Sequence, residues 1–331
     1  MRSGYETALY LCKIIPLSTE RRTTMNHTFI LYGLAVHSAI DIPEAHRWEP
    51  PDRSADVIIR RAEVLPQGAL EEREDGPVVS RQPGGTLLME FKNIGRYQVD
   101  PSGITIWPIA GVADDLLRLP ILGLVLSAVL VGRGLPVLHA SALRVGDEAV
   151  AFIGDKRFGK STMAATLWER GHHLISDDVV ILDPREPSGW TVRPGPTGVK
   201  LWPDAIESLG IPDQAHYPLC EGATKRILDT RERHATEPVP LRRIYVLGRG
   251  EQVKVESITA SDGLIELMRN AFMYRYPEVV PNAQAQLLAT YAPIRRTVDM
   301  KVLLRPADKD RLTEVAEAIE ADLQTSAAPA A

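Results

Sequence analysis

The feature that most constrains this chain is a glycine-containing loop between an apolar run and a helical pattern. The loop runs from Gly154 to Ser161 and fits the spacing G-x-x-x-x-G-K-[S/T]. The apolar run Ala149–Ile153 precedes it, and a helical pattern follows from Ser161 to Arg170. This spacing also arises by chance, and a glycine-containing turn before a helix can be purely structural. The flanking strand and helix are what favour a phosphate-binding loop. Together they predict a phosphate-binding loop in an α/β domain.

The loop predicts a site for the phosphates of a nucleotide. Its backbone N–H groups and the positive end of the helix dipole would face the phosphates. Lys160 is expected to reach the terminal phosphates, and the Ser161 hydroxyl is expected to ligate Mg²⁺. The candidate nucleotide-binding residues are Gly154, Asp155, Lys156, Arg157, Phe158, Gly159, Lys160, Ser161 and Thr162.

A second group of polar residues, Ser176-Asp177-Asp178, ends the strand pattern that follows the loop helix. Ligands of open α/β sheets lie beyond the carboxyl ends of the strands, so the aspartate pair and the loop are expected to converge. Adjacent side chains of an extended chain point in different directions. One carboxylate could therefore hold Mg²⁺ while the other accepts a hydroxyl proton, as phosphoryl transfer requires. A surface turn with two capping aspartates is the alternative.

Composition sets outer limits on the fold and its partners. A chain of 331 residues with 44% hydrophobic content can form one large or two ordinary domains. Its net charge of −5 provides no general attraction to nucleic acid or to an anionic membrane surface, so neither is predicted as a partner. Cys12 and Cys220 lack metal-ligand spacing and suit a reducing, cytoplasmic location. The apolar segment 121–131 is shorter than the ~20 residues that cross a bilayer, and it predicts a buried helix.

Short strand patterns separated by turn sequences predict a small antiparallel domain over residues 25–111. The strands are expected at 28–36, 56–60, 86–91, 96–99 and 104–107. Residues 1–24 differ in pattern and are expected to be a non-structural extension, with Met25 as a candidate start. We place the domain boundary near Gly111, the catalytic domain at 112–325 and a flexible tail at 326–331.

The catalytic domain is predicted to alternate strands and helices. A helix over 112–131 should break at Pro120, which lacks the N–H of a helical hydrogen bond. Gly171 is expected to end the loop helix. Further strands are predicted at 137–145, 148–153, 172–176, 179–183, 190–192, 244–247, 253–258 and 298–304, and further helices at 203–209, 262–274, 283–291 and 309–325.

A third candidate is His139, although a lone histidine more often packs in a core or faces solvent. Its segment LHASAL is followed by GDKRFGKST and then by ERGHHLISDDVVIL. In order and spacing these runs resemble the catalytic domain of HPr kinase/phosphorylase, over residues 135–183. The later segments RPGPTGVKLWPDAI and PLRRIYVL, and the β-rich front domain, resemble small HPr-kinase-like kinases of lasso peptide biosynthesis.

The resemblance implies a P-loop kinase domain of the HPr kinase/phosphoenolpyruvate carboxykinase type, with a smaller β-rich N-terminal domain. It implies that Asp177 is the general base on an acceptor serine, that His139 tunes it, and that Asp178 and Ser161 hold Mg²⁺. ATP or another nucleotide would be the donor. The acceptor would be a peptide or protein, and the resemblance to the kinases of lasso peptide biosynthesis implies the C-terminal serine of a lasso precursor peptide. The enzyme would be a homo-oligomer.

Two departures from the family pattern stand out. The family loop has a small residue at Lys156 and a glycine at Arg157, so donor preference could differ here. The signature of the reverse, phosphorolytic reaction is not recognisable over 193–200, which argues against a phosphorylase activity. Six basic residues also follow in the sequence and are expected mostly to face solvent, with an acidic substrate or the donor as the alternative: Lys225, Arg226, Arg231, Arg233, Arg242 and Arg243.

Two other functions fit the same residues. One is a kinase of a sugar or metabolite hydroxyl, because the same fold type also includes phosphoenolpyruvate carboxykinase. The other is a nucleotide-binding regulatory module without turnover. The intact Asp177–Asp178 pair argues against the second.

Overall fold

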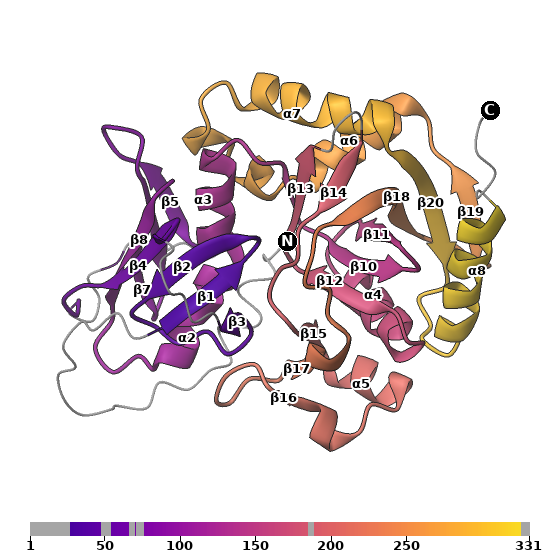
Figure 1. The fold of residues 1–331 in the computed structure, drawn as a ribbon, viewed down its shortest axis with the longest axis horizontal. Coiled ribbons are helices and arrows are strands. Elements are labelled where there is room, and N and C mark those ends of the chain that lie inside the picture. Colours follow the sequence, from indigo (N-terminus) through magenta and orange to yellow (C-terminus); the bar gives the residue numbers. More distant parts are fainter. Residues whose placement is uncertain (1–26, 48–53, 66–69, 71–75, 185–188, 326–331) are drawn as a thin grey trace. The chain divides into compact units, whose positions relative to one another are not determined.

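The computed structural model describes residues 27–47, 54–65, 70, 76–184 and 189–325. The predicted extension 1–24, the candidate start at Met25 and the tail 326–331 lie outside these residues. The chain is a mixed α/β protein with several sheets, and it divides into two compact units (Figure 1). The first unit contains residues 1–137, 218–225 and 272–286, and the second contains 138–217, 226–271 and 287–331.

The first unit is built on an eight-stranded sheet with the order β3-β1-β2-β4-β8-β7-β6-β5. All five predicted strand regions fall in it, and two short strands, β3 and β5, were not predicted. The strands are β1 (His27–Leu31), β2 (Leu34–Ser38), β3 (His46–Arg47), β4 (Val57–Arg61), β5 (Val78–Arg81), β6 (Leu87–Phe91), β7 (Gly95–Asp100) and β8 (Gly103–Pro108).

The single strand predicted over 28–36 is wrong, because the structure has a tight hairpin there. β1 and β2 pair antiparallel, with Leu31 opposite Leu34. The two turn residues, Tyr32 and Gly33, have φ of 53° and 75°. Positive φ at both central residues is the geometry of a two-residue hairpin whose twist matches that of its strands. The apolar side chains on both sides of the turn hid the reversal from the sequence pattern.

The prediction of an antiparallel domain holds for only part of this sheet. β4 pairs parallel with β2 and with β8, whereas β5 to β8 form an antiparallel meander. Parallel neighbours need a long connection between them. The chain provides one after β2 and another in the excursion through β5, β6 and β7 that separates β4 from β8.

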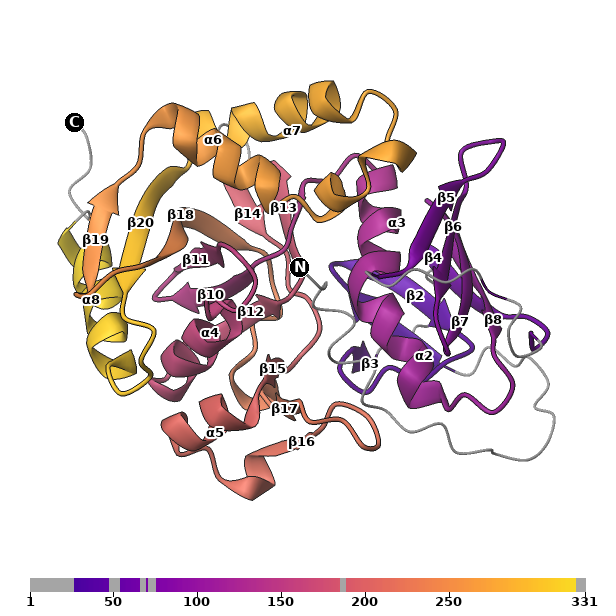
Figure 2. The same cartoon turned by 180° about the vertical axis from the view of Figure 1, so that it is seen from behind.

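The predicted helix over 112–131 forms, but it is interrupted at Gly123 and not at Pro120, whose backbone angles are helical. It consists of α2 (Asp114–Pro120), a π-helical turn (Ile121–Val125) with non-helical angles at Gly123, and α3 (Leu126–Gly132). Figures 1 and 2 show α2 and α3 along one face of the first sheet, and the Tyr97 hydroxyl on β7 donates to the Leu117 carbonyl at 2.9 Å.

The continuous helical stretch is longer than the apolar segment 121–131 from which a buried helix was predicted. Counted from Asp114 to Gly132 it has 19 residues and a mean hydropathy of 1.9, enough by length and composition to cross a membrane. Of its apolar window, 83% is buried within the structure, which is also the property of a core helix. The prediction of a buried helix is thus confirmed. The argument that the segment is too short to cross a bilayer does not hold for the full helical stretch.

The compact units place α2 and α3 with the first sheet, whereas the sequence places them with the catalytic domain. The domain boundary near Gly111 stays a prediction.

The second unit contains a nine-stranded sheet whose main path has the order β12-β10-β11-β18-β14-β13-β9. β20 joins β18, and β19 joins β20. The strands are β9 (Val137–Leu138), β10 (Ser141–Val145), β11 (Glu148–Ile153), β12 (His173–Asp177), β13 (Val180–Pro184), β14 (Trp190–Val192), β18 (Val239–Arg249), β19 (Lys254–Ser257) and β20 (Asp299–Arg305).

A separate three-stranded sheet has the order β15-β17-β16, and none of its strands was predicted. The strands are β15 (Val199–Leu201), β16 (His216–Pro218) and β17 (Arg226–Leu228). Three-residue strands are too short to show a period of two, which is why the sequence pattern missed them.

The larger helices match the predicted regions to within three residues, except that α6 ends before, and α7 continues past, the expected end. They are α4 (Lys160–Glu169), α5 (Pro203–Leu209), α6 (Ala260–Arg269), α7 (Ala283–Thr297) and α8 (Leu312–Thr325). Short 3₁₀ turns occur at Asp213–Ala215, Arg231–Arg233, Phe272–Arg275 and Pro277–Val279.

Alternation along β11 explains the layers of the second unit. Val150 and Phe152 belong to a core shared with α4, α5 and α8, whereas Ala151 and Ile153 belong to a core shared with α6 and α7. Side chains of a strand alternate between the two faces of a sheet, so a strand covered on both faces is apolar throughout. Figure 1 shows α4 and α8 on one side of the sheet and α6 and α7 on the other.

Gly171 ends the loop helix as predicted. Its φ is +97°, its N–H donates to the Trp168 carbonyl at 2.9 Å, and the His172 N–H donates to the Leu167 carbonyl at 3.2 Å. These two bonds form a Schellman motif.

Gly171→Ala is therefore expected to lower the free energy of unfolding by about 1 kcal/mol, from backbone strain alone. A Cβ at this glycine would meet no atom within 4 Å, so a clash does not contribute. Urea denaturation measures the effect. The matched change Glu169→Ala, on the exposed last turn of α4, should stay within about 0.5 kcal/mol of wild type. Equal effects of the two changes would contradict the assignment.

Candidate functional site

The site lies where the carboxyl ends of several strands of the second unit meet. β11 runs parallel to β18, and β18 runs parallel to β20. β10 is antiparallel to both β11 and β12, so β12 has the same direction as β11. The loop after Ile153 and the aspartate at the end of β12 therefore leave the same edge of the sheet. The predicted convergence of the loop and the aspartate pair is confirmed by a 2.9 Å hydrogen bond from Ser161 Oγ to Asp177.

The backbone of the loop has left-handed or related conformations at three positions. φ is +142° at Gly154, +68° at Arg157 and +90° at Gly159. The glycines adopt such angles freely, whereas an arginine is strained there. The chain thus keeps, at Arg157, the backbone conformation that a glycine would favour.

Arg157→Gly is expected to raise the free energy of unfolding by about 1 kcal/mol by relieving this strain. Lys156→Gly is the matched control, because Lys156 is not among the described residues with positive φ. It should instead destabilise, by about 0.5–1 kcal/mol, through backbone entropy. Urea denaturation of both variants measures the difference. A loss of stability in the Arg157 variant as large as in the control would contradict the strain at this position.

Lys160 begins α4, and its ammonium group lies back over the loop. Nζ donates to the Gly154 carbonyl at 2.7 Å and to the Asp155 carbonyl at 3.3 Å, and the residue is buried. The Gly154 N–H donates in turn to Asn270 Oδ1 at 3.1 Å. The ammonium group of the buried lysine is therefore held against the start of the loop by two carbonyl groups.

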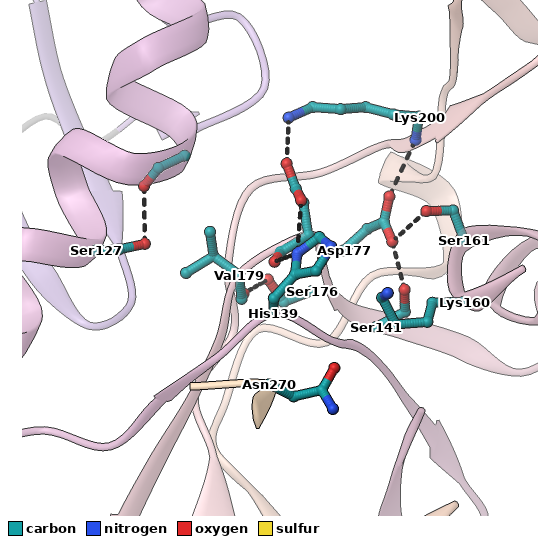
Figure 3. Close-up of polar contacts among 12 residues, drawn as sticks. Ser127, His139, Ser141, Lys160, Ser161, Ser176, Asp177, Val179, Lys200 and Asn270 are labelled. Atoms are coloured by element: carbon teal, nitrogen blue, oxygen red, sulfur yellow. Dashed lines mark hydrogen bonds and ion pairs between the residues drawn. The ribbon is translucent and has the colours of Figure 1, made fainter. Parts of the chain in front are cut away.

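Asp177 is held by two hydroxyl groups and one backbone amide. Its Oδ1 accepts hydrogen bonds from Ser141 Oγ at 2.5 Å and from Ser161 Oγ at 2.9 Å, and its Oδ2 accepts one from the Lys200 N–H at 3.1 Å (Figure 3). Ser141 stands directly opposite Asp177 in the β10–β12 register, next to a bulge after Ala142. The loop serine is therefore coupled to the first carboxylate of the pair.

Asp178 is held by two cationic or potentially cationic side chains. Its carboxylate lies 3.0 Å from His139 Nδ1 and 3.0 Å from Lys200 Nζ. His139 Nδ1 also lies 3.0 Å from the Asp178 carbonyl oxygen. The backbone at Asp178 has φ of +75°, a strained conformation of the kind that clusters at functional sites. The two adjacent aspartates thus contact different side chains, while Lys200 contacts Asp177 through its backbone N–H and Asp178 through its ammonium group.

These surroundings separate the pKa values of the two carboxyl groups. Burial, and then the charge of Asp178, raise the pKa of Asp177 above its usual value, although hydrogen bonds from Ser141 and Lys200 oppose the shift. Burial alone would also raise the pKa of Asp178. The charge of Lys200 and the hydrogen bond from His139 outweigh it and hold that pKa well below its usual value. Asp178 is therefore firmly ionised at neutral pH.

Sequence reasoning missed three residues of this site. Ser141 stands two positions after His139, Lys200 is the central residue of β15, and Asn270 follows α6 as its C-cap. Val199 and Leu201 are buried, so the alternation of β15 turns Lys200 away from the core and towards the aspartates. For Lys200 this alternation was the only signal in the sequence, and a strand of three residues is too short to show it.

Asn270 joins the loop to the segment that carries His139. Its side-chain oxygen accepts the Gly154 N–H, its backbone carbonyl accepts the His139 N–H at 2.7 Å, and its Nδ2 donates to the Glu266 carbonyl at 2.9 Å. The residue is 7% exposed. These bonds fix the relative positions of two of the predicted site residues.

The structure does not bring the six basic residues together as one site. Arg243 is buried, contrary to the expected solvent exposure, and it pairs with Asp299 and Asp322. Arg233 stacks over the Trp168 ring at 4.0 Å. The others have separate surroundings, with Arg226 bonded to His216, Arg231 to Asp229 and Arg242 to Glu148, while Lys225 lies in the first compact unit.

Comparison with known proteins adds no family assignment. No family model and no curated protein matches this chain. Among solved structures, it is similar to one described as the Hpr(Ser) kinase/phosphatase from Coxiella burnetii, with 13% identity over 57% of this chain and 97% of that chain. The TM-score is 0.31. At that TM-score the likeness carries no weight for function, so the function is inferred from the geometry of the site.

The residues present fit a nucleotide-bound Mg²⁺ ion better than a metal held by protein alone. Among the described residues no group of three or more His, Cys, Asp or Glu side chains could hold a metal ion. Mg²⁺ commonly uses one or two carboxylates, waters and substrate phosphates. The hydrogen-bonded Ser161 and Asp177 offer the hydroxyl and carboxylate of such a site.

Proposed function

We propose that this chain is a phosphotransferase that uses a nucleoside triphosphate, with ATP as the expected donor, and Mg²⁺ to phosphorylate a serine hydroxyl of a peptide or protein. The observation that carries this proposal is the contact between the phosphate loop and the aspartate pair, from Ser161 to Asp177, with His139 and Lys200 on the neighbouring Asp178. A loop that only binds phosphate needs no second carboxylate, so the separately held Asp178 favours transfer of the phosphoryl group over binding alone.

The contact with Ser161 favours a different division of roles from the one that the resemblance implies, whereas the raised pKa of Asp177 suits that carboxyl group to the role of base. In P-loop enzymes the loop serine and an aspartate from a neighbouring strand hold Mg²⁺, which neutralises charge on the transferring phosphoryl group when it is bound. Here the aspartate in contact with Ser161 is Asp177, and we assign the metal to these two residues. Asp178, in contact with His139, is then the base. The opposite assignment stays a prediction, and the same variants test both.

In this mechanism each residue acts on a defined atom. The Asp178 carboxylate accepts the proton of the acceptor hydroxyl as its oxygen bonds to the γ-phosphorus. His139 and Lys200 hold that carboxylate ionised and oriented. The bond from the γ-phosphorus to the bridging oxygen breaks, and Lys160 stabilises the charge that develops on the phosphate oxygens. Asn270 keeps Gly154 and the His139 segment in register.

The acceptor itself is proposed from the sequence resemblance. The residues LHASAL, GDKRFGKST and ERGHHLISDDVVIL support a peptide or protein serine, and the later segments support the C-terminal serine of a lasso precursor peptide. Homo-oligomeric assembly and a cytoplasmic location are likewise proposals that follow from resemblance and composition.

Mass spectrometry tests this function directly. The full-length protein, incubated with ATP, Mg²⁺ and a peptide that ends in serine, should add about 80 Da to the peptide. The matched peptide ending in alanine should gain no mass. Transfer to sugars or metabolites but to no peptide would identify a small-molecule kinase instead. Nucleotide binding with no transfer to any acceptor would identify a regulatory module.

A further inference from the structure

Two arginines from distant parts of the sequence contact the phosphate loop. Arg249 ends β18, Arg305 ends β20, and the parallel register of these strands places the two side by side. Arg305 Nη2 donates to the Phe158 carbonyl at 2.7 Å, and Arg249 Nη2 donates to the Arg157 carbonyl at 3.1 Å. Two consecutive carbonyl groups of the loop are therefore held by guanidinium groups.

The charge of this pair is not balanced within the described part of the chain. Neither Arg249 nor Arg305 forms an ion pair with a carboxylate of the described residues. Arg305 is only 4% exposed, and its Nε is buried without a hydrogen-bond partner among those residues. Burial, together with the neighbouring charge of Arg249, lowers the pKa of Arg305 to about 10. A buried cation usually has a carboxylate partner, so the charge of Arg305 is unfavourable in the protein alone, whereas Arg249 is exposed to solvent.

The hydrogen bond from Arg305 also sets the direction of one backbone amide. In a trans peptide the C=O and N–H groups point in opposite directions. Because the Phe158 carbonyl faces Arg305, the N–H of Gly159 faces away from it. The guanidinium group lies so close to the backbone that a Cβ at Gly159 would overlap Arg305 Nη2. Glycine is thus required here both for its φ of +90° and for the approach of Arg305.

We propose that Arg249 and Arg305 are positioning residues for the phosphate loop, and that bound nucleoside triphosphate supplies the negative charge that balances them. This inference rests on the proposed function. The pair holds the two carbonyl groups on one side of the loop, so that the Gly159 amide is turned towards the phosphates. Its charge adds to that of Lys160 and favours ligands with more phosphate groups.

The test compares Arg305→Met with wild type by calorimetric titration of ATP and AMP. Each lost charge-assisted contact should weaken ATP binding about tenfold to a hundredfold, with a smaller effect on AMP. Arg249→Met should act in the same direction, and Arg305→Lys should recover part of the affinity because it keeps the charge. Arg311→Met is the matched control, since Arg311 pairs with Glu314 at the surface and should bind ATP as wild type does.

Thermal unfolding separates positioning from a merely structural role. Removal of an unbalanced buried charge should leave the melting temperature of the nucleotide-free Arg305→Met protein unchanged or raised, while the increase caused by ATP becomes smaller. A lower melting temperature without nucleotide, together with an unchanged ATP dissociation constant, would overturn this inference. Failure of the wild-type protein to bind ATP would instead overturn the proposed function.

Discussion

Replacing Asp178 by asparagine is expected to lower the rate of phosphoryl transfer by about a thousandfold, within the range of a lost general base. Asparagine keeps the size of the side chain but cannot accept the proton of the attacking hydroxyl. The ATP dissociation constant should change little, because Asp178 contacts His139 and Lys200 and not the loop serine. Single-turnover kinetics with saturating ATP measure the rate.

Two further variants show whether this effect belongs to Asp178. Asp147→Asn changes an exposed carboxylate on the turn between β10 and β11 and should leave the rate unchanged. Asp177→Asn should weaken the apparent affinity for Mg²⁺ by about tenfold to a hundredfold, so that added Mg²⁺ recovers activity. If Asp177→Asn abolishes transfer at every Mg²⁺ concentration and Asp178→Asn does not, then Asp177 is the base, as the sequence resemblance implies.

Lys160→Met is expected to lower the transfer rate by about a hundredfold to a thousandfold, since it removes a fixed cation from the transferring phosphoryl group. Methionine retains most of the apolar stem that is buried at the start of α4. Rates of transfer and of ATP hydrolysis, measured under single turnover, should fall together. Circular dichroism should show an unchanged fold.

Lys254→Met provides the matched control, because Lys254 is an exposed residue of β19. Its transfer rate should equal that of wild type. A Lys160 variant that retained more than a third of the wild-type rate would show that the ammonium group, which contacts the loop carbonyls in this structure, does not act on the phosphates.

Sequence patterns located the loop and its flanking elements almost to the residue. The predicted strand 148–153 is β11, and the predicted helix 161–170 is α4 shifted by one residue. Each of these elements ends at a residue with a strong local preference: Gly154 after the strand and Gly171 after the helix. The hairpin at Tyr32 and Gly33 was missed because its turn residues lie inside an apolar run. Sequence patterns therefore located the end of an element where a glycine marked it, and failed where the turn residues lay among apolar residues.

The partners of the site residues were beyond sequence reasoning. Ser141 and Asp177 are 36 residues apart, Gly154 and Asn270 are 116 apart, and Phe158 and Arg305 are 147 apart. The contact between Ser141 and Asp177 depends on the register of β10 and β12, including the bulge after Ala142, and a shift of one residue would turn both side chains to the other face. No periodicity within one segment contains that information.

The sequence by itself therefore determined that this chain has a strand–loop–helix unit of the phosphate-binding type, followed by an aspartate pair at the end of a strand. Backbone conformation and helix ends depend on residues within about one turn of each other, and those neighbours are all in the motif. Only the tertiary structure decided that Asp177 meets Ser161, that Asp178 meets His139 and Lys200, and that Arg249 and Arg305 hold the loop. These contacts form only when distant strands pair in one register, because that pairing sets the direction of each side chain.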